Sequence, residues 1–458
     1  MRDREVAQQL PEMIQPRIAG TRFSHSYFSV MMSLSNGINR HPKLGNRMAT
    51  SRRRASWRRS WPQMWQAGYQ AIDLAQLLSW GALGVMLYAY LGYPALLLLV
   101  ARLRPFRVSA CSSELPSVTM IVAAWNEEAV IASKVENTLT QDYPRERLSL
   151  IVVSDGSTDS TDLIVERYAA ETPRVQLLRT AGREGKSVAL NIGAAAACGD
   201  VLVMTDANAI FEPDAVRRLV CPLSDPAVGS VSGQLLYRKG KGTEATEGAY
   251  WRYEQVVKRL ESGMGSLLGA NGSIYALRRA LYHPIRPRDV NDFRLPYEVL
   301  LAGKAVVLEQ RAISVEAAAG DLWGEYSRKA RIMSRAIPTM LGLIPRTLAK
   351  GRLLLLWQLV SHKLLREVQG IFFLAMLVGA AWGAAAGDVL LLKFLVAQLL
   401  LYAIGALGWA LPHADPRPLH LAAHFDMIAL ASVAALGRWL GGRVRATWEP
   451  TRAPGREA

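Results

Sequence analysis

The chain has 458 residues, half of them hydrophobic, with 54 Lys and Arg against 38 Asp and Glu and a formal net charge of +16. Its length suggests roughly two to four domains, and its apolar content excludes a largely disordered chain. Three cysteines, Cys111, Cys198 and Cys221, share no metal-ligand spacing, and an odd number makes a poor disulfide framework. A reducing compartment is therefore expected for the working part of the chain.

The positive charge is concentrated at the two ends. Residues 1–72 carry 12 Lys and Arg against three Asp and Glu, and residues 438–458 carry five Arg against two Glu. The small remaining excess gives a nucleic-acid-binding core little support, and basic runs beside a membrane segment more often contact anionic lipid. We expect residues 1–74 to be a basic arm that is disordered or precedes the true start at Met48 or Met64, and residues 438–458 to be a basic tail.

The first predicted element is a transmembrane helix over residues 75–104. Residues 77–101 are 25 consecutive positions without a charge, and Arg102, Arg104 and Arg107 come directly after them. About 20 apolar residues span the hydrocarbon core of a bilayer. These arginines favour a cytoplasmic location for the next part of the chain, although the basic arm favours the opposite orientation.

Residues 105–350 are predicted to form a soluble α/β domain. Short β-branched runs alternate with stretches of helical spacing, such as 129–140 and 160–170, which indicates a parallel sheet covered on both faces. The predicted strands are residues 118–124, 148–154, 175–178 and 200–205. Ligands bind beyond the carboxyl ends of such strands, so the polar residues after each run are the candidate site.

Taken one at a time, these polar residues have ordinary readings as well. Asp155 lies in an Asp-Gly-Ser-Thr-Asp segment that also suits a turn or a helix cap. Asp206 and Asn208 offer the oxygen ligands that hard divalent cations use together with phosphates. Lys186 lacks the glycine spacing of an ATPase-type phosphate loop but remains a point charge for a phosphate. Asp292, between apolar neighbours, is a candidate general base or a paired surface acid.

The C-terminal part is predicted to return to the membrane. An interfacial helix is expected over residues 351–369, and transmembrane helices are expected within 370–437. The three apolar blocks are residues 370–387, 389–411 and 419–436. Three full spans would place the basic tail outside, against the positive-inside rule, so we expect one of them to lie in the interface or not to span.

In combination, the motifs resemble a membrane-embedded family 2 glycosyltransferase, a group that includes cellulose, hyaluronan and poly-N-acetylglucosamine synthases. The resemblance covers about residues 75–450. It rests on the ordered segments AAWNEE, SDGSTD, GKSVALNIG, TDAN, GANGSIYALRR and VNDFRLP, and it extends to SHKLLR and GRWL…TWEPTR.

The resemblance implies a GT-A fold, an α/β domain with a mostly parallel sheet, flanked by one transmembrane helix before it and about three after. It also implies a nucleotide-diphosphate sugar as donor, inversion at the anomeric carbon, and a divalent cation, Mg²⁺ or Mn²⁺. The implied roles are nucleoside binding by Asn126, Glu127 and Asp155, phosphate contacts by Lys186 and Arg331, metal ligation by Asp206 with Asn208, and base catalysis by Asp292.

Three positions depart from the family pattern. Asn208 stands where a second metal-binding acid is usual, and Asn291 precedes the expected base where an acid is frequent. The Gln-x-x-Arg-Trp motif of the processive synthases is replaced by Arg-Lys-Ala-Arg-Ile at residues 328–332, which retains Arg331 but lacks Gln and Trp. The loss of a stacking platform for a growing glycan favours a non-processive enzyme or a short product.

The sequence therefore predicts an inner-membrane, multi-pass, metal-dependent inverting glycosyltransferase whose catalytic domain faces the cytoplasm. It would move a sugar from a UDP-sugar to a lipid-linked or growing glycan acceptor in contact with membrane lipids, alongside polysaccharide export partners and without nucleic acid. Two alternatives stay open: a polyprenyl-phosphate glycosyltransferase that makes a single-sugar lipid, and a non-catalytic nucleotide-sugar-binding scaffold of an export complex.

Overall fold

The computed structural model describes residues 72–109, 111–112, 114–238, 244–317, 322–411, 417–444 and 447. The chain divides after Ala67, and every described residue belongs to the second unit, Gly68–Ala458. The basic arm expected over residues 1–74 lies outside the described residues except for its last three positions. The expected basic tail is described only at residues 438–444 and 447.

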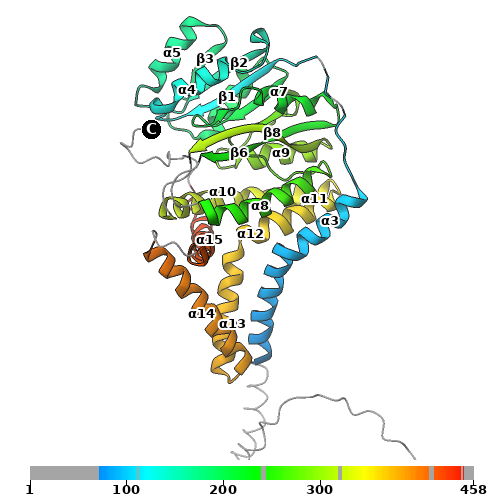
Figure 1. Ribbon diagram of the computed structural model, residues 1–458, viewed down its shortest axis with the longest axis vertical. Coiled ribbons are helices and arrows are strands. Elements are labelled where there is room, and N and C mark those ends of the chain that lie inside the picture. Colours follow the sequence, from blue (N-terminus) through cyan, green and yellow to red (C-terminus); the bar gives the residue numbers. More distant parts are fainter. Residues whose placement is uncertain are drawn as a thin grey trace, which may run out of the picture. The chain divides into compact units, whose positions relative to one another are not determined.

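Within the described residues, the middle domain is built on one eight-stranded sheet in the order β3-β2-β1-β4-β7-β6-β8-β5 (Figure 1). The first four strands in that order are parallel, as predicted, because a helix connects each to the next one along the chain and returns the chain to the same end of the sheet. They are β1 (Val118–Ala124), β2 (Leu148–Ser154), β3 (Val175–Arg179) and β4 (Val201–Thr205).

The other half of the sheet is mixed. β7 (Tyr275–Arg278) runs antiparallel to β4 and to β6 (Val228–Arg238). β8 (Ala305–Ala317) is parallel to β6, and the short β5 (Ile210–Phe211) pairs antiparallel with β8 at the edge. The pairing of β5 with β8 returns the chain to the sheet after β4. The C-terminal end of β8 therefore lies beside the loop that joins β4 to β5.

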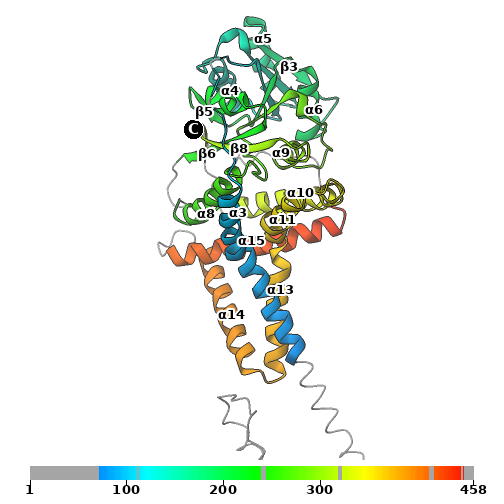
Figure 2. The same ribbon diagram turned by 90° about the vertical axis from the view of Figure 1, so that its right-hand side faces the viewer.

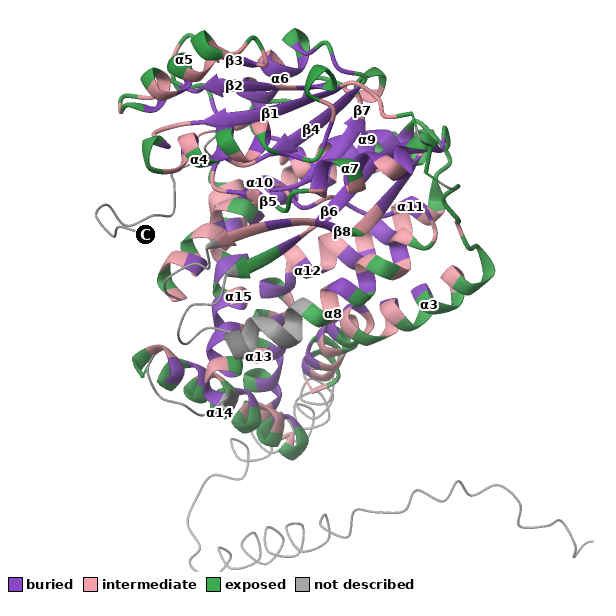
Figure 3. Cartoon of the chain, turned by 45° about the horizontal axis from the view of Figure 1, so that its top comes forward, coloured by how far each residue is buried: buried purple, intermediate pink, exposed green. Residues whose placement is uncertain are grey.

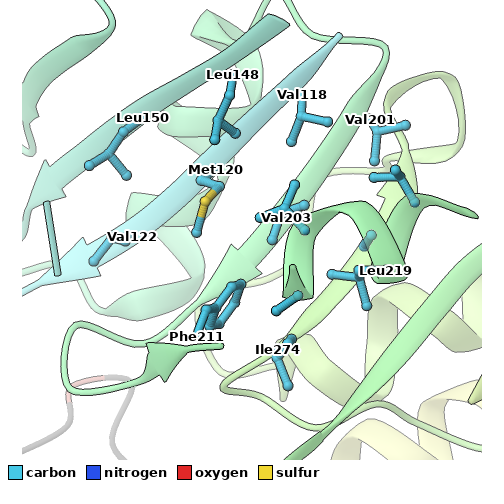
Figure 4. Packing of buried hydrophobic residues seen from close by; sticks show 14 of the residues in the cluster. Val118, Met120, Val122, Leu148, Leu150, Val201, Val203, Phe211, Leu219 and Ile274 are labelled. Carbon is cyan, nitrogen blue, oxygen red and sulfur yellow. The ribbon is translucent and has the colours of Figure 1, made fainter. Parts of the chain in front are cut away.

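Helices cover the two faces of the sheet. Successive residues of β1 point to opposite faces, so Met120 and Val122 enter one core cluster (Figure 4) and Ile121 and Ala123 enter another. The central strands are therefore buried on both faces (Figure 3). The first cluster packs against α4 (Glu128–Leu139) and α7 (Ala215–Val220), and the second packs against α6 (Lys186–Ala196). The remaining domain helices are α5 (Thr161–Glu171), α8 (Glu244–Ser262), α9 (Asn291–Leu301) and α10 (Leu322–Ala349).

The apolar segments predicted from the sequence are helical. Among the described residues, three helices are long and apolar enough to cross a membrane: Ile72–Leu103, which contains η1 (Tyr88–Gly92) and α3 (Tyr93–Leu103), α14 (Val389–Ala410), and Leu419–Leu440 of α15 (Arg417–Leu440). A fourth candidate is a pair bent by 61°, in which Leu353–Glu367 precedes Gln369–Ala385. That pair comprises α11 (Leu353–Gln358), η5 (Leu359–Leu364), α12 (Leu365–Glu367) and α13 (Gln369–Ala385).

The last of these helices, α15, is placed unlike α13 and α14. It runs across both of them and packs lengthwise against α10 of the middle domain (Figure 2). Ala330, Met333 and Ile337 of α10 share a buried cluster with Ala431 and Ala435 of α15. This helix therefore lies at the junction between the middle domain and helices α13 and α14.

Two of the three cysteines form a disulfide, whereas their odd number predicted a poor disulfide framework. Cys111, in the segment before β1, and Cys221, at the end of α7, are joined in a disulfide with their Cα atoms 5.0 Å apart, while Cys198 is an exposed free thiol. The pairing joins residues 110 positions apart in the sequence, so it depends on packing that cysteine spacing does not reveal.

Candidate active site

The predicted site residues gather where β1, β2 and β4 end, but their roles there differ. Asp155 comes directly after β2 and is fully buried. Its Oδ1 accepts hydrogen bonds from the backbone N–H of Glu184 (2.8 Å) and Gly185 (3.0 Å), and its Oδ2 accepts from Gly185 as well (2.9 Å). Gly185 has a φ of +100°, a conformation that favours glycine. The carboxylate therefore fixes the loop that leads into Lys186.

Asn126 and Glu127 lie after β1 and join it to the loop after β2. Asn126 has a positive φ of 52°, and its Oδ1 accepts a hydrogen bond from the backbone N–H of Thr158 at 2.8 Å. The backbone N–H of Glu127 donates to the hydroxyl of Thr161 at 2.8 Å. These bonds hold the two loops in one fixed shape.

Lys186 and Asp206 form an ion pair. Lys186 begins α6, Asp206 comes directly after β4, and the ammonium donates to the carboxylate. Burial is the largest single influence and would lower the pKa of Lys186, but the charge and hydrogen bond of Asp206, together with the charges of Asp292 and Glu316, raise that pKa above its ordinary value. Lys186 is therefore a fixed positive charge at the end of the sheet.

Asp292 lies in the first turn of α9 and faces a glycine-rich segment before β7. A Cβ added at Gly272 would lie 2.9 Å from Oδ2 of Asp292, and the backbone N–H of Ala270 donates to the Asp292 carbonyl at 2.7 Å. Burial, reinforced by the charge of Asp206, raises the pKa of Asp292, while Lys186 and Lys258 oppose that rise. A carboxylate with a raised pKa is suited to accept a proton.

Arg331 is not the arginine that reaches this cluster most directly. It lies on α10 near Arg335, whose guanidinium is buried and donates to the Asp289 carbonyl at 2.8 Å and, at 3.5 Å, to the hydroxyl of Ser187. Arg335 thereby joins the start of α6 to the loop that precedes Asp292. Arg335 was not predicted as a site residue, because nothing in its local pattern distinguishes it from the other basic residues of α10.

Lys134 is a second residue that was not predicted from the sequence. It is fully buried on α4, and its ammonium donates to the Thr205 hydroxyl (2.9 Å) and the Ala209 carbonyl (2.6 Å), on either side of the loop with Asp206. Burial lowers the pKa of Lys134 to about 7, although nearby Asp206 and Glu316 act in the other direction. The sequence signal that could have identified Lys134 is its place on the apolar face of a helix, between Ile131 and Val135.

Glu316, near the end of β8, is a third residue of the site that was not predicted from the sequence. Burial and then the charge of Asp206 raise its pKa to about 7, and Lys186 and Arg328 act in the opposite direction. The signal in the sequence was a carboxylate after a β-rich segment that ends in Ile-Ser-Val, an arrangement similar to the one that marked Asp206.

The donor set at the end of β4 is compatible with a divalent cation. Asp206 supplies a carboxylate and Asn208 an amide oxygen, both hard ligands of the kind that Mg²⁺ and Mn²⁺ take. Among the described residues, no group of three or more His, Cys, Asp or Glu is assembled to hold a metal ion. The residues therefore fit a cation that obtains its other ligands from a diphosphate and water.

Comparison with known proteins agrees with this geometry. Residues 119–283 match Glycosyl transferase family 2. An N-acetylglucosaminyltransferase of Bradyrhizobium elkanii is 35% identical over 125 residues, which cover 27% of this chain and 68% of the relative. A beta-monoglucosyldiacylglycerol synthase of Synechocystis is 35% identical over 176 residues, which cover 36% of each chain. The alignments thus span 36% to 45% of the length of the first relatives.

One solved structure resembles most of the chain. A mannosyltransferase from Pyrobaculum calidifontis, in complex with GDP-mannose and Mn²⁺, superposes with a TM-score of 0.59 at 24% identity. The match covers 80% of this chain and 100% of that one. The fold expected from the sequence, a GT-A-type domain with a mostly parallel sheet and flanking apolar helices, is confirmed.

Proposed function

The chain belongs to glycosyl transferase family 2 and is a glycosyltransferase, and from this we propose that it is a metal-dependent inverting enzyme that uses a UDP-sugar. The acceptor is a lipid-linked or growing glycan at the membrane, in cell-envelope or extracellular polysaccharide synthesis. The observation that carries the proposal is the meeting of Asp206, Lys186 and Asp292, three charges from separate elements, beyond the carboxyl ends of the parallel strands.

In this reaction Asp292 takes the proton of an acceptor hydroxyl as the hydroxyl oxygen attacks the anomeric carbon. A new C–O bond forms while the bond from that carbon to the diphosphate oxygen breaks. Because attack occurs on the face opposite the leaving group, the configuration at that carbon inverts. The raised pKa of Asp292 brings its basicity closer to that of a working general base than an exposed aspartate allows.

The donor is held by the ends of β1, β2 and β4. Asp155, Asn126 and Glu127 shape the loops that receive the nucleoside, and Lys186 offers a positive charge to the phosphates. Asp206 and Asn208 would hold a divalent cation, which would neutralise the charge that develops on the departing diphosphate. Arg331, on α10, is assigned to the acceptor side or the phosphates.

The names of relatives support a lipid or glycan acceptor. One relative is a monoglucosyldiacylglycerol synthase and another an N-acetylglucosaminyltransferase. Two observations favour a second candidate function, which is the transfer of one sugar to a lipid such as a polyprenyl phosphate. The chain lacks the Gln-x-x-Arg-Trp motif, and one relative is a monoglucosyldiacylglycerol synthase.

The candidate spans support a location in the membrane. We place the protein in the inner membrane with the catalytic domain in the cytoplasm, because Arg102, Arg104 and Arg107 come directly after the first helix. Polysaccharide export proteins are the partners proposed for a glycan product.

The proposal is tested with the detergent-purified full chain, Mg²⁺ or Mn²⁺ and a panel of UDP-sugars, with UDP release as the readout. We expect release from one donor, stimulated by a lipid acceptor and lost in Asp292→Asn and Asp206→Ala. Mass spectrometry of the product distinguishes a single-sugar lipid from an oligomer. Measurable UDP binding with no turnover of any donor would contradict the proposed reaction and favour the nucleotide-sugar-binding scaffold or a missing partner subunit.

A further inference from the structure

Glu316 lies directly beside the loop that carries Asp206 and Asn208. Strands β5 and β8 pair antiparallel with Ile210 opposite Val315, so the next pair in register is Ala209 and Glu316. Ala209 is the residue immediately after Asn208. The two strands therefore bring a carboxylate from 108 positions further along the chain to the end of the proposed metal loop.

Only part of the Glu316 carboxylate is satisfied by the residues around it, which include the Ser273 side chain. Its Oε1 is shielded from solvent and has no hydrogen-bond partner among the described residues. It interacts electrostatically with Asp206, which repels it, and with Lys186, which attracts it. A shielded carboxylate oxygen without a partner is costly, so its presence at this position calls for a ligand or a role.

The loop that carries Asp206 and Asn208 has little free negative charge for the divalent cation that it is proposed to bind. Asp206 is paired with Lys186, and Asn208 supplies only an uncharged amide oxygen. A divalent cation is bound more tightly as the number of charged oxygen ligands rises. The pairing of β8 with the edge strand β5 brings Glu316 to the place where this loop has an amide instead of a second acid.

We propose that Glu316 acts as the second carboxylate toward the divalent cation of the donor complex, in place of the acid that Asn208 does not provide. This inference rests on the proposed function, because it assumes a cation bound with a nucleotide diphosphate at Asp206. Glu316 either ligates the cation or holds a ligating water, and in both cases its charge favours binding of the cation.

The test is direct binding of Mn²⁺ to the detergent-purified full chain in the presence of UDP, measured by the electron paramagnetic resonance signal of free Mn²⁺. Glu316→Gln keeps the shape of the side chain and removes its charge. Glu309→Gln is the matched control, because Glu309 lies on the same strand and pairs with Arg311. We expect Glu316→Gln to weaken Mn²⁺ binding about 10- to 100-fold, and Glu309→Gln to leave it unchanged.

A rescue variant separates a role toward the metal from a role in folding. Asn208→Asp restores a second acid to the loop, so the double variant Asn208→Asp/Glu316→Gln should recover most of the Mn²⁺ affinity. Unchanged Mn²⁺ binding in Glu316→Gln, with loss in Asp206→Asn, would overturn the inference and leave the proposed function standing. A wild-type chain that binds UDP but no Mn²⁺ would overturn the proposed metal dependence and this inference with it.

Discussion

Gly272 and Asp292 are in such close approach that a single methyl group at residue 272 would lie 2.9 Å from Oδ2 of the carboxylate. The segment before β7 thus forms one wall of the position that Asp292 occupies. Since Asp292 is the proposed base, the side chain at 272 sets where that base can lie.

The first prediction is that Gly272→Ala lowers turnover by displacing Asp292. A shift of about 1 Å in a catalytic group can cost about 100-fold in rate, so a loss of that order in kcat is expected with donor binding preserved. Gly342→Ala, on α10 with nothing within 4 Å of the added Cβ, is the matched control. Equal kcat in Gly272→Ala and wild type would contradict this role of the glycine.

The second prediction concerns the pH dependence of the reaction. Asp292 must be deprotonated to accept a proton, and its pKa is raised above the ordinary 3.8. Turnover should therefore fall as the pH falls, beginning above the range of an exposed aspartate. Lys258 opposes the rise of this pKa, so Lys258→Met should move the acidic limb of the kcat/KM profile to higher pH. Lys304→Met, which removes an exposed lysine bonded to the Pro226 carbonyl, should not move it.

The third prediction concerns the buried ammonium of Lys134. Lys134→Met leaves the Thr205 hydroxyl and the Ala209 carbonyl without their donor, at a cost of about 1–3 kcal/mol in unfolding free energy. Burial lowers the pKa of Lys134 from 10.5 to about 7, so between these pH values the unfolded chain binds more protons than the folded one. The stability of wild type relative to Lys134→Met should then increase as the pH rises from about 7, as thermal melts of both proteins would report.

The fourth prediction concerns a buried group of charges between α8 and the membrane helices. Glu261 accepts hydrogen bonds from the Tyr93 hydroxyl of α3 (2.7 Å) and the Leu268 backbone N–H (3.1 Å), and it contacts Nδ1 of His362 at 2.6 Å. Removing one partner of a buried charged pair is strongly destabilising, so Glu261→Gln should cost about 3 kcal/mol or more. Glu171→Gln, an exposed control, should leave the melting temperature unchanged.

The fifth prediction concerns the position of α15 across α13 and α14. If α15 does not cross the bilayer, its end at Leu440 lies on the same side as the exposed Cys198 of the catalytic domain. In a Cys198→Ala background, Leu440→Cys should react with an impermeant maleimide from the side that labels Cys198 in wild type. Gly387→Cys, between α13 and α14, should react from the opposite side. Labelling of Leu440→Cys together with Gly387→Cys would show instead that α15 spans.

Elements with a local signal could be predicted from the amino-acid sequence. Strands at 118–124 and 148–154 agree with the structure residue for residue, because a buried parallel strand is a continuous apolar run. Asp206 and Asp292 could be proposed as site residues because each lies in a segment that resembles a family motif, TDAN and VNDFRLP. The apolar helices were found because a bilayer sets a length and composition that no neighbouring segment alters.

Long-range pairings, in contrast, became visible only in the folded chain. Glu316 joins the site through an edge pairing with β5, Arg335 through the contact of α10 with the loop before Asp292, and Lys134 through burial against the β4 loop. The crosswise position of α15 is likewise set by its packing on α10. Each of these depends on contacts between segments far apart in the chain, and hydrophobic periodicity carries no information about which distant segments will meet.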